Sequence, residues 1–491
     1  MYPYDSIRDY AADLESQGKL IRIGELDQDK YEITALSYRM KDRLKDKAPA
    51  FLVERTRING KWYDTPVVAE LYNNFGMVAR CFGVDRISDN QGEMYDAAVA
   101  RILSFMDKDF KWKKIDPVIV DREKAPCKDV VITGDEVSLD LFPWVRNNPA
   151  DAGQYISAGS VIMDDPELGR NVGTYRMQVK GPRKVGVYFT NQSHGYKYMM
   201  QAAERGEEKV RVSVAVGIDP ISWMMSSTRL ADVDEDEFAL AGGFRGKPVE
   251  LVQSETNDLY VPAHAEFVLE GEISMETEEE GPYGEMLGYI GKKVYTFCID
   301  ITAITHRTKP WVYNLWPGVG GAYLTLPWEV AHFARLKKIM PSLVKLHTPP
   351  DTASIVIACI DKRLPGEGIE AGMLILGYRM IGFGKKMVIV LDKDIDPTDL
   401  SRVLHAVGTR WQPDPASLIV RQSFHIPLEP SSREMFLSSK IVIDATRQLP
   451  GEGGPDVYPD DNRTVMDERA AGAFETIDRN WTNYFSGGDK P

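Results

Sequence analysis

The chain has 491 residues, of which 73 are acidic and 59 are basic, so its formal net charge is −14. Such a surface repels nucleic acids and anionic membranes, because binding to polyphosphate requires clustered lysine and arginine. Hydrophobic residues make up 43% of the chain, which is enough for two or three cores, since single cores stop growing at about 250–300 residues. We therefore expect a multidomain globular protein whose partners are neither nucleic acids nor membranes.

The sequence also predicts neither a membrane helix, a signal peptide nor a histidine-based zinc motif. No apolar run reaches the roughly 18–20 residues that a membrane helix requires, and the N-terminus lacks the basic start and apolar core of a signal peptide. The seven histidines form neither HxH nor HExxH, which argues against a histidine-based zinc protease. We expect a cytoplasmic protein, because the four cysteines form no CxxC pair and suit reduced thiols: Cys81, Cys127, Cys298 and Cys359.

The N-terminal region predicts a small α/β domain over residues 1–115. Its first apolar residues recur at i, i+3, i+4 and i+7, which predicts one buried helix face. Asp5 or Ser6 can cap the start of this helix, and Gly18 can end it. A short strand is predicted at 20–23. The apolar face consists of Ile7, Tyr10, Ala11 and Leu14.

The middle of the chain, residues 116–325, is rich in β-forming residues. Five segments contain many valines, isoleucines, threonines and aromatic residues, with few long helical patterns between them. Strands at this frequency predict a barrel or a sandwich. The segments are 171–188, 210–217, 248–253, 266–270 and 295–304.

Residues 326–450 show short apolar strands alternating with helices, which indicates an open α/β sheet. Pro327 can occupy the first turn of a helix, and further helices are expected near 366–380 and 398–410. The tail, 451–491, is rich in Gly, Pro and Asp and has a possible short helix near 466–480. The predicted strands are 355–360, 387–391, 418–420 and 441–443.

Three segments of the middle region contain residues that could take part in catalysis or bind a metal ion. In the strand-like run 171–176, alternation places Asn171 and Tyr175 on one face and Thr174 and Arg176 on the other. Taken alone, each of these residues fits an ordinary barrel strand.

His194 and Glu237 stand on separate segments, and each taken alone suits a structural or solvated position. Together with Asn171 they form an amide, an imidazole and a carboxylate. Such a mixed oxygen and nitrogen set suits Mn²⁺ or Mg²⁺ held together with a phosphate, rather than a closed zinc site.

The run from Glu276 to Glu285 ends in a turn forced by Gly281, Pro282 and Gly284. The turn holds Glu280 and Glu285 on either side of a short bridge. Paired carboxylates near an arginine provide a proton donor whose pKa burial raises and the cation lowers. A solvated acidic loop is the alternative interpretation.

Taken in order, these motifs resemble the UbiD family of decarboxylases. The motifs are NxGxYR, a following histidine, DEFALAGGFRG, VPAHAEFVLEG and EGPYGE, and the resemblance covers nearly the whole chain. It implies an N-terminal α/β domain, a central flavin-binding split β-barrel and a C-terminal α/β domain.

The resemblance also assigns roles to individual residues. It implies that Arg176, Glu280 and Glu285 form a catalytic network. It implies that Asn171, His194 and Glu237 bind a divalent ion, Mn²⁺ or Mg²⁺, which anchors the flavin phosphate. Near the phosphate, a K⁺ site is expected beside residues 226–229, although Arg229 departs from the apolar residue often found in family loops. Other contacts to the cofactor are implied for Thr174, Ser193, His194, Ser227 and Lys440.

The implied reaction is reversible, non-oxidative decarboxylation of an aromatic, heteroaromatic or α,β-unsaturated carboxylic acid with prenylated FMN. A cofactor is needed because side chains alone cannot hold the charge left on carbon when CO₂ leaves. Arg176 would orient the substrate carboxylate, Glu285 would deliver the replacing proton, and Glu280 would tune both. The implied partners are a flavin prenyltransferase that supplies the cofactor and further copies of the chain, as a dimer or an assembly of dimers.

The segment 316–327 is expected to line the substrate pocket. Its centre is Gly320, Gly321 and Ala322, which leave room, whereas some relatives that act on hydroxylated benzoates have a histidine there. We expect a larger fused-ring or heteroaromatic acid. The glycines could instead serve only to shape a loop.

Several functional alternatives stay open. The enzyme could run mainly as a carboxylase, act as a hydroxybenzoate decarboxylase, or serve as a subunit of a multi-subunit aromatic carboxylase. A plain flavin reductase is disfavoured, because no GxGxxG follows a strand to bind a dinucleotide.

Overall fold

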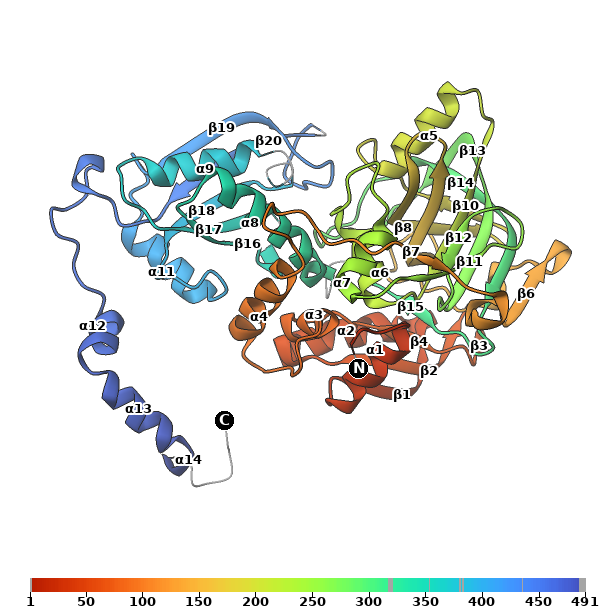
Figure 1. Ribbon diagram of the computed structural model, residues 1–491, viewed down its shortest axis with the longest axis horizontal. Coiled ribbons are helices and arrows are strands. Elements are labelled where there is room, and N and C mark those ends of the chain that lie inside the picture. The colour runs from red at the N-terminus through yellow and green to blue at the C-terminus, as the bar shows by residue number, and fades with distance from the viewer. Residues whose placement is uncertain are drawn as a thin grey trace.

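The computed structural model describes residues 2–316, 321–352, 354–378, 381, 384–434 and 436–484. Its mixed α/β architecture contains four β-sheets (Figure 1). In this view the N-terminal elements, in red and orange, lie below a yellow and green barrel, and the blue C-terminal sheet lies to one side. The boundaries 1–115, 116–325 and 326–450 stay predictions.

The N-terminal sheet has the order β1-β2-β4-β15, with β3 paired to β2. The predicted first helix is confirmed as α1, Ile7–Ser16, whose N-cap Ser6 accepts a hydrogen bond from the Asp9 backbone N–H. The last strand, β15, comes from the middle of the chain and pairs with β4 in parallel. The other elements are β1 (Leu20–Asp27), α2 (Glu32–Leu44), β2 (Ala50–Ile58), β3 (Lys61–Tyr63), β4 (Val67–Ala69), α3 (Phe75–Cys81), α4 (Gln91–Leu103) and β15 (Val312–Asn314).

The predicted barrel is confirmed. Six strands in the order β13-β10-β7-β8-β9-β14 close on themselves, because β13 also pairs with β14, and β6 extends the sheet beyond β14. Register shifts in β7, β8 and β13 provide the local bends that closure needs. The strands are β6 (Val130–Thr133), β7 (Tyr155–Asp165), β8 (Gly169–Gly181), β9 (Lys184–Val187), β10 (Lys209–Val216), β13 (Phe267–Glu280) and β14 (Val294–His306).

The structure differs from the sequence prediction in several strands of the middle region. β7 was not predicted, because its glycine, serines and alanine give a weak β signal. β13 continues to Glu280 through the exposed acidic run, which pairs with β14. The predicted strand 248–253 is confirmed as β11, but it lies outside the barrel in a small sheet of order β12-β11-β5: β5 (Val118–Ile119), β11 (Glu250–Gln253) and β12 (Tyr260–Pro262).

Three helices lie against the barrel and contact β8. α6 has Pro220 at its first turn and α7 begins at Glu237, while α5 begins at His194. All three therefore start or end at residues named above as candidate ligands or phosphate contacts. Their bounds are α5 (His194–Glu204), α6 (Pro220–Thr228) and α7 (Glu237–Arg245).

The C-terminal sheet has the order β16-β17-β18-β20-β19, in which β17, β18 and β20 are parallel and the two edge strands are antiparallel. β19 was expected to be buried, yet Ile419 is exposed because β19 is an edge strand. The elements are α8 (Leu326–Ile339), β16 (Leu343–His347), β17 (Ile355–Ile360), α9 (Glu367–Gly377), β18 (Met387–Asp392), α11 (Leu400–Arg410), β19 (Ser417–Phe424) and β20 (Leu437–Asp444).

Beyond the C-terminal sheet, three short helices form an arm that stands away from the rest of the protein (Figure 1). They are α12 (Asn462–Arg469), α13 (Ala471–Arg479) and α14 (Trp481–Tyr484). Within the described ranges, no helix is both long and apolar enough to cross a membrane.

Candidate active site

Arg176 lies in β8 and binds two glutamates at once. Its Nη2 lies 2.8 Å from Glu280 Oε2, and its Nη1 donates to Glu285 Oε1. Glu280 is the last residue of β13, and Glu285 follows in the turn that leaves this strand. The structure thus brings together the three predicted catalytic side chains, although more than 100 residues separate Arg176 from either carboxylate.

This triad is removed from solvent. The Glu280 side chain is 0% exposed and those of Arg176 and Glu285 are 10% exposed, so the three charges interact in a low dielectric. The Tyr155 hydroxyl donates a 2.7 Å hydrogen bond to the second oxygen of Glu280. Both oxygens of Glu280 are therefore bound, one by Arg176 and one by Tyr155.

Two aromatic rings flank the guanidinium of Arg176. Its Cζ lies 4.3 Å from the ring centroid of Tyr188 and 4.9 Å from that of Tyr283. Aromatic faces attract cations and exclude water, so the rings favour a charged, oriented arginine. The Nε of Arg176 is buried and has no hydrogen-bond partner in the part of the chain that the structure describes.

Burial and charge shift the pKa values of Glu285, Arg176 and Tyr155. Burial raises the pKa of Glu285 above its ordinary value, and Arg176 opposes this rise only in part. Burial alone would lower the pKa of Arg176, but the two carboxylates outweigh burial and raise it. Burial and the Glu280 charge raise the pKa of Tyr155, which keeps its hydroxyl a neutral donor.

The turn that holds Glu285 is fixed by backbone hydrogen bonds. The buried Asp151 carboxylate accepts the Gly284 N–H at 2.8 Å, and the Glu285 N–H donates to the Tyr289 carbonyl at 2.8 Å. A Cβ on Gly284 would lie 2.9 Å from the Trp316 ring. Only glycine therefore lets this turn pack against Trp316 without a shift.

A second group of predicted residues lies near the start of β8, five residues before Arg176. Asn171 is 2% exposed, and its Nδ2 has no partner among the described residues. Glu237, the first residue of α7, is 5% exposed and accepts the Val172 N–H at 2.8 Å. Burial raises the pKa of Glu237 to about 8, since no lysine or arginine of the described residues pairs with it.

His194 is the first residue of α5, a helix that contacts β8. The Tyr175 hydroxyl accepts the Gly195 N–H at 3.1 Å, which holds the start of α5 against the strand. Burial, together with the charge of Arg229, lowers the pKa of His194 and favours the neutral imidazole that a metal ligand needs. Helix N-termini also attract anions such as phosphate.

The described residues contain no group of three or more His, Cys, Asp or Glu side chains arranged to hold a metal ion. The predicted set has only two such residues, since its third member is an asparagine. A buried glutamate that pairs with no lysine or arginine of the described residues, a buried amide whose oxygen can coordinate a cation, and a neutral imidazole nevertheless fit a divalent ion. The donor chemistry is therefore compatible with the implied metal.

The other predicted cofactor contacts lie around the same strand, with one exception. Thr174 Oγ1 lies 2.8 Å from Ser226 Oγ, which joins β8 to α6. Ser227 donates to backbone carbonyls of α6, and Ser193 caps α5. Lys440 lies in β20 of the C-terminal sheet, where it pairs in register with Val420.

One prediction lies outside the described residues, and several neighbours of the triad were not predicted. Gly320 is not described, and of Gly321 and Ala322 only the backbone is described, in the 3₁₀ segment Gly321–Thr325. The sequence analysis assigned no role to Tyr155, Tyr188, Tyr283 or Asp151. Of these four residues, only Tyr283 could have been singled out from the sequence, because it lies inside the EGPYGE motif.

Comparison with protein families identifies the class of this enzyme. Domain models described as the N-terminal, Rift-related and C-terminal domains of 3-octaprenyl-4-hydroxybenzoate carboxy-lyase match residues 11–92, 118–320 and 322–445. The chain therefore belongs to the UbiD family and is a decarboxylase of the carboxy-lyase class.

Similar proteins extend over almost the whole chain. The chain is 31% identical over 477 residues to the phenolic acid decarboxylase of Sedimentibacter hydroxybenzoicus, covering 92% of this chain and 93% of that one. The vanillic acid decarboxylase of the same organism, in its closed form, has a TM-score of 0.81 at 28% identity and covers 97% and 100%. An evolved dimeric form of the UbiD-class enzyme HmfF from Pelotomaculum thermopropionicum, in complex with prFMN, has a TM-score of 0.75 at 27% identity and covers 96% and 100%.

The hydrogen bond from Tyr155 to Glu280 is expected to stabilise the fold. Tyr155→Phe leaves one buried oxygen of Glu280 without a donor, so we expect it to lower the free energy of unfolding by about 1–2 kcal/mol. Tyr283→Phe is the matched control, because the Tyr283 hydroxyl has no partner among the described residues. Urea denaturation of both variants measures the difference, and an equal loss in the two would contradict the assignment.

Proposed function

We propose that this enzyme catalyses the reversible, non-oxidative decarboxylation of an aromatic carboxylic acid with prenylated FMN. The observation that carries the proposal is the buried Arg176, bound by Glu280 and Glu285. A fixed cation for a carboxylate and a carboxyl with a raised pKa are what proton-for-CO₂ exchange requires. The relatives named as phenolic acid and vanillic acid decarboxylases support an aromatic acid, and the HmfF complex supports prFMN.

We assign the cofactor to the region where α5, α6 and α7 meet β8. When bound, prenylated FMN would supply the electron sink for the charge left on carbon. Asn171, His194 and Glu237 would hold a divalent ion, Mn²⁺ or Mg²⁺, which would supply positive charge for the flavin phosphate. Ser193, Thr174, Ser227 and Lys440 would contact the cofactor, and a K⁺ ion beside residues 226–229 stays a prediction of the family resemblance.

Arg176 would orient the substrate carboxylate. The rings of Tyr188 and Tyr283 lie against its guanidinium group. They therefore fix the orientation of the guanidinium plane before substrate binds. When CO₂ departs as a neutral molecule, Arg176 loses the charge of the substrate. The positive charge of Arg176 then interacts with Glu280 and Glu285 alone.

Glu285 would deliver the proton, and Glu280 would tune Arg176 and Glu285 electrostatically. Both oxygens of Glu280 are occupied, one by Arg176 and one by the Tyr155 hydroxyl. Arg176 donates a hydrogen bond to one oxygen of Glu285, and burial raises the pKa of this carboxyl. Two residues of the same type would thus have different roles, Glu285 as the proton donor and Glu280 as a fixed partner of Arg176.

The substrate is proposed to be a fused-ring or heteroaromatic acid larger than a hydroxybenzoate. This part of the proposal rests on the small residues Gly320, Gly321 and Ala322 and is independent of the triad. The proposed partners are a flavin prenyltransferase as cofactor supplier and further copies of the chain.

The proposal as a whole is tested on protein co-expressed with a flavin prenyltransferase. We expect mass spectrometry of the released flavin to give prenylated FMN, and metal analysis to give a stoichiometric divalent ion. A panel from hydroxybenzoates to fused-ring and heteroaromatic acids should then release CO₂, fastest with the larger acids. Activity confined to dihydroxybenzoates would overturn the substrate assignment, and no CO₂ from any acid would overturn the function.

Glu237→Gln provides the control for the cofactor site in that experiment. This variant removes the charge that would face the metal, so we expect it to lose both the divalent ion and the bound flavin. Glu235→Gln is matched in type and lies two residues away, where Glu235 pairs with Lys114. Retention of metal in Glu237→Gln would exclude Glu237 as a ligand.

Glu285→Gln tests the proton donor. General acid steps typically contribute about 10²–10⁴-fold, so we expect kcat to fall by at least about 10²-fold in protein that has bound its flavin. Glu279→Gln is the matched control, because Glu279 is half exposed and pairs with Lys293 on the outside of the barrel. Near-native turnover of Glu285→Gln with cofactor bound would refute the assignment.

A further inference from the structure

Arg229 ends α6 in a left-handed backbone conformation, with φ 50° and ψ 47°. A residue other than glycine is uncommon in this conformation, and such residues cluster at functional sites. The backbone on both sides is held in place, because Thr228 is 6% exposed and Leu230 is 3% exposed. Three residues earlier, the Ser226 hydroxyl joins α6 to Thr174 of β8. Arg229 is itself exposed, so its positively charged side chain starts from a fixed point beside the barrel.

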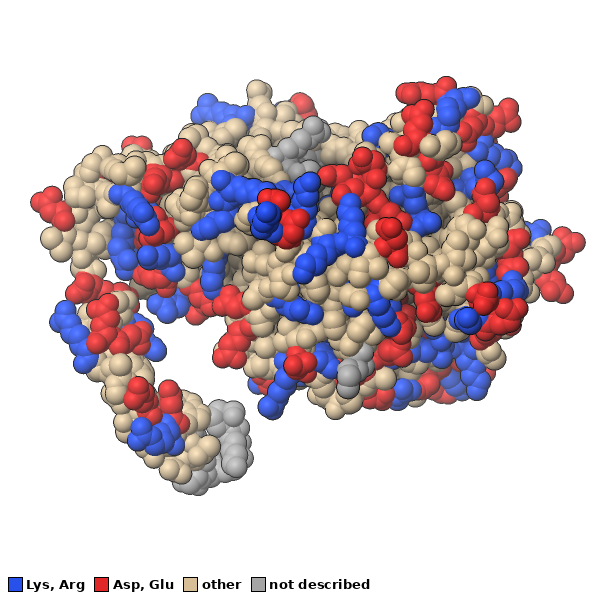
Figure 2. Space-filling view, viewed as in Figure 1, with Lys and Arg blue, Asp and Glu red and all other residues tan. Residues whose placement is uncertain are grey.

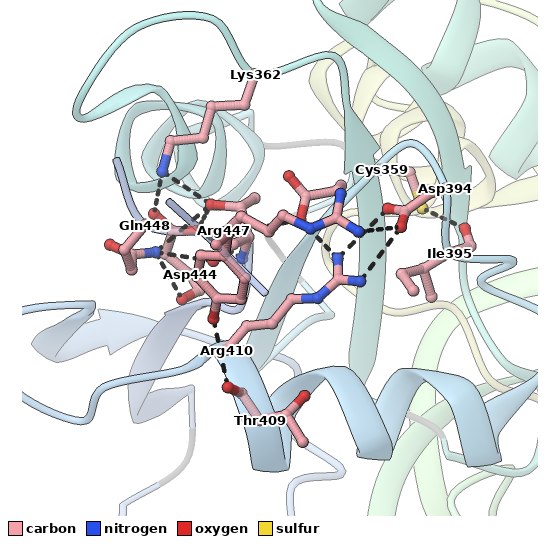
Figure 3. Close-up of polar contacts among 12 residues, drawn as sticks. Cys359, Lys362, Asp394, Ile395, Thr409, Arg410, Asp444, Arg447 and Gln448 are labelled. Carbon is pink, nitrogen blue, oxygen red and sulfur yellow. Dashed lines mark hydrogen bonds and ion pairs between the residues drawn. The ribbon is translucent and has the colours of Figure 1, made fainter. Parts of the chain in front are cut away.

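The charge of Arg229 has no carboxylate partner within the described part of the chain. In the C-terminal sheet, by contrast, Arg410 and Arg447 both bind Asp394, at 3.2 Å and 2.9 Å (Figure 3). On the face of the molecule drawn in Figure 2, blue Lys and Arg atoms lie among red Asp and Glu atoms. An arginine without a carboxylate partner is suited to bind an anionic ligand.

Arg229 acts on the residues around the start of α5. Burial lowers the pKa of His194, and the charge of Arg229 lowers it further. Burial raises the pKa of Tyr175, and Arg229 opposes this rise. Lys197 and Asp232 also act on His194, but with opposite signs, so their charges offset each other. Arg229 therefore adds a positive charge near the N–H groups at the start of α5, which attract phosphate.

The side chains just before Arg229 do not form a set of oxygens prepared for K⁺. Ser227 and Thr228 each donate to a backbone carbonyl inside α6, at 2.9 Å and 2.7 Å. The Ser226 hydroxyl makes three hydrogen bonds to other groups of the protein, at 2.8–2.9 Å. A cation site needs several oxygens that converge on one point. The hydroxyl groups of residues 226–228 therefore fit the implied K⁺ ion poorly.

The charges proposed for the flavin site balance without K⁺. A divalent ion and Arg229 carry positive charges that equal the negative charges of Glu237 and a phosphate dianion, whose charge is about −2. Lys440, the cofactor contact proposed on β20, would add a further positive charge. A K⁺ ion would therefore add a positive charge without a negative partner, and burial makes such a charge costly.

We propose that Arg229 binds the flavin phosphate and supplies the positive charge that the family resemblance assigns to K⁺, so that this enzyme holds its flavin without a monovalent cation. The inference rests on the proposed flavin site, but it does not depend on which acid the enzyme decarboxylates. A guanidinium suits this role, because its planar fork can bind two phosphate oxygens and keeps its charge at every working pH. Since it is attached to the chain, it need not be bound from solution.

Titration of the flavin-free, full-length protein with FMN tests the role of Arg229. Flavin fluorescence gives the Kd for FMN with excess Mn²⁺, in buffers that contain either K⁺ or tetramethylammonium at equal ionic strength. We expect the wild-type protein to have the same Kd in both buffers. In the K⁺-free buffer, Arg229→Met should raise the Kd at least about tenfold, because it removes charge-assisted hydrogen bonds to the phosphate. Arg229→Lys should recover part of this loss, since it keeps the charge.

Two controls separate phosphate binding from a structural role. Riboflavin has no phosphate, so Arg229→Met should leave its Kd unchanged. Arg86 is also exposed and has no ion pair among the described residues, so Arg86→Met should leave the Kd for FMN unchanged.

Three results would each overturn the proposal: a wild-type Kd for FMN that rises when K⁺ is removed, an unchanged Kd in Arg229→Met, or an equal loss for riboflavin. A wild-type protein that binds no FMN in either buffer would also overturn it. FMN binding as expected, with no CO₂ released from any acid by the enzyme loaded with prenylated FMN, would instead overturn the proposed function and leave the role of Arg229 standing.

Discussion

The burial of one arginine with two carboxylates is the constraint on which the site depends. Arg176, Glu280 and Glu285 cannot all be ionised in a low dielectric without leaving one unbalanced negative charge. The structure answers this by fixing Glu280 with a second donor, Tyr155, and by raising the pKa of Glu285. The site therefore favours a proton on Glu285. A bound cation or substrate group that changes the net charge of the triad would also alter this preference.

Strand β8 connects this triad to the proposed cofactor region. Along one strand, Val172 binds α7, Thr174 binds α6, Tyr175 binds α5 and Arg176 binds the two glutamates. Because successive residues alternate sides, a single strand can hold helices and carboxylates in a fixed relation. The closed barrel keeps β8 rigid, since both of its neighbours, β7 and β9, belong to the same ring of strands.

Much of the fold could be predicted from local pattern, whereas the contacts of the site could not. The face of α1 and the strands β17 and β18 follow from spacing and apolar runs, and the motifs in order identified Arg176, Glu280 and Glu285. Tyr155 was missed because its bond to Glu280 joins residues 125 apart in sequence. β13 was predicted too short because its exposed acidic end resembles a loop, and only its pairing with β14 reveals a strand.

Glu285 is proposed to donate the proton, and burial raises its pKa in favour of the protonated form. A donor acts in its protonated form, which exists below its pKa, and the pKa of Glu285 is raised. The direct measurement is kcat for CO₂ release against pH in the flavin-loaded wild-type enzyme. The account predicts a kcat that is level at low pH and falls tenfold per pH unit once the pH passes a raised carboxyl pKa. A kcat that rises with pH, or that does not change with pH across that range, would contradict it.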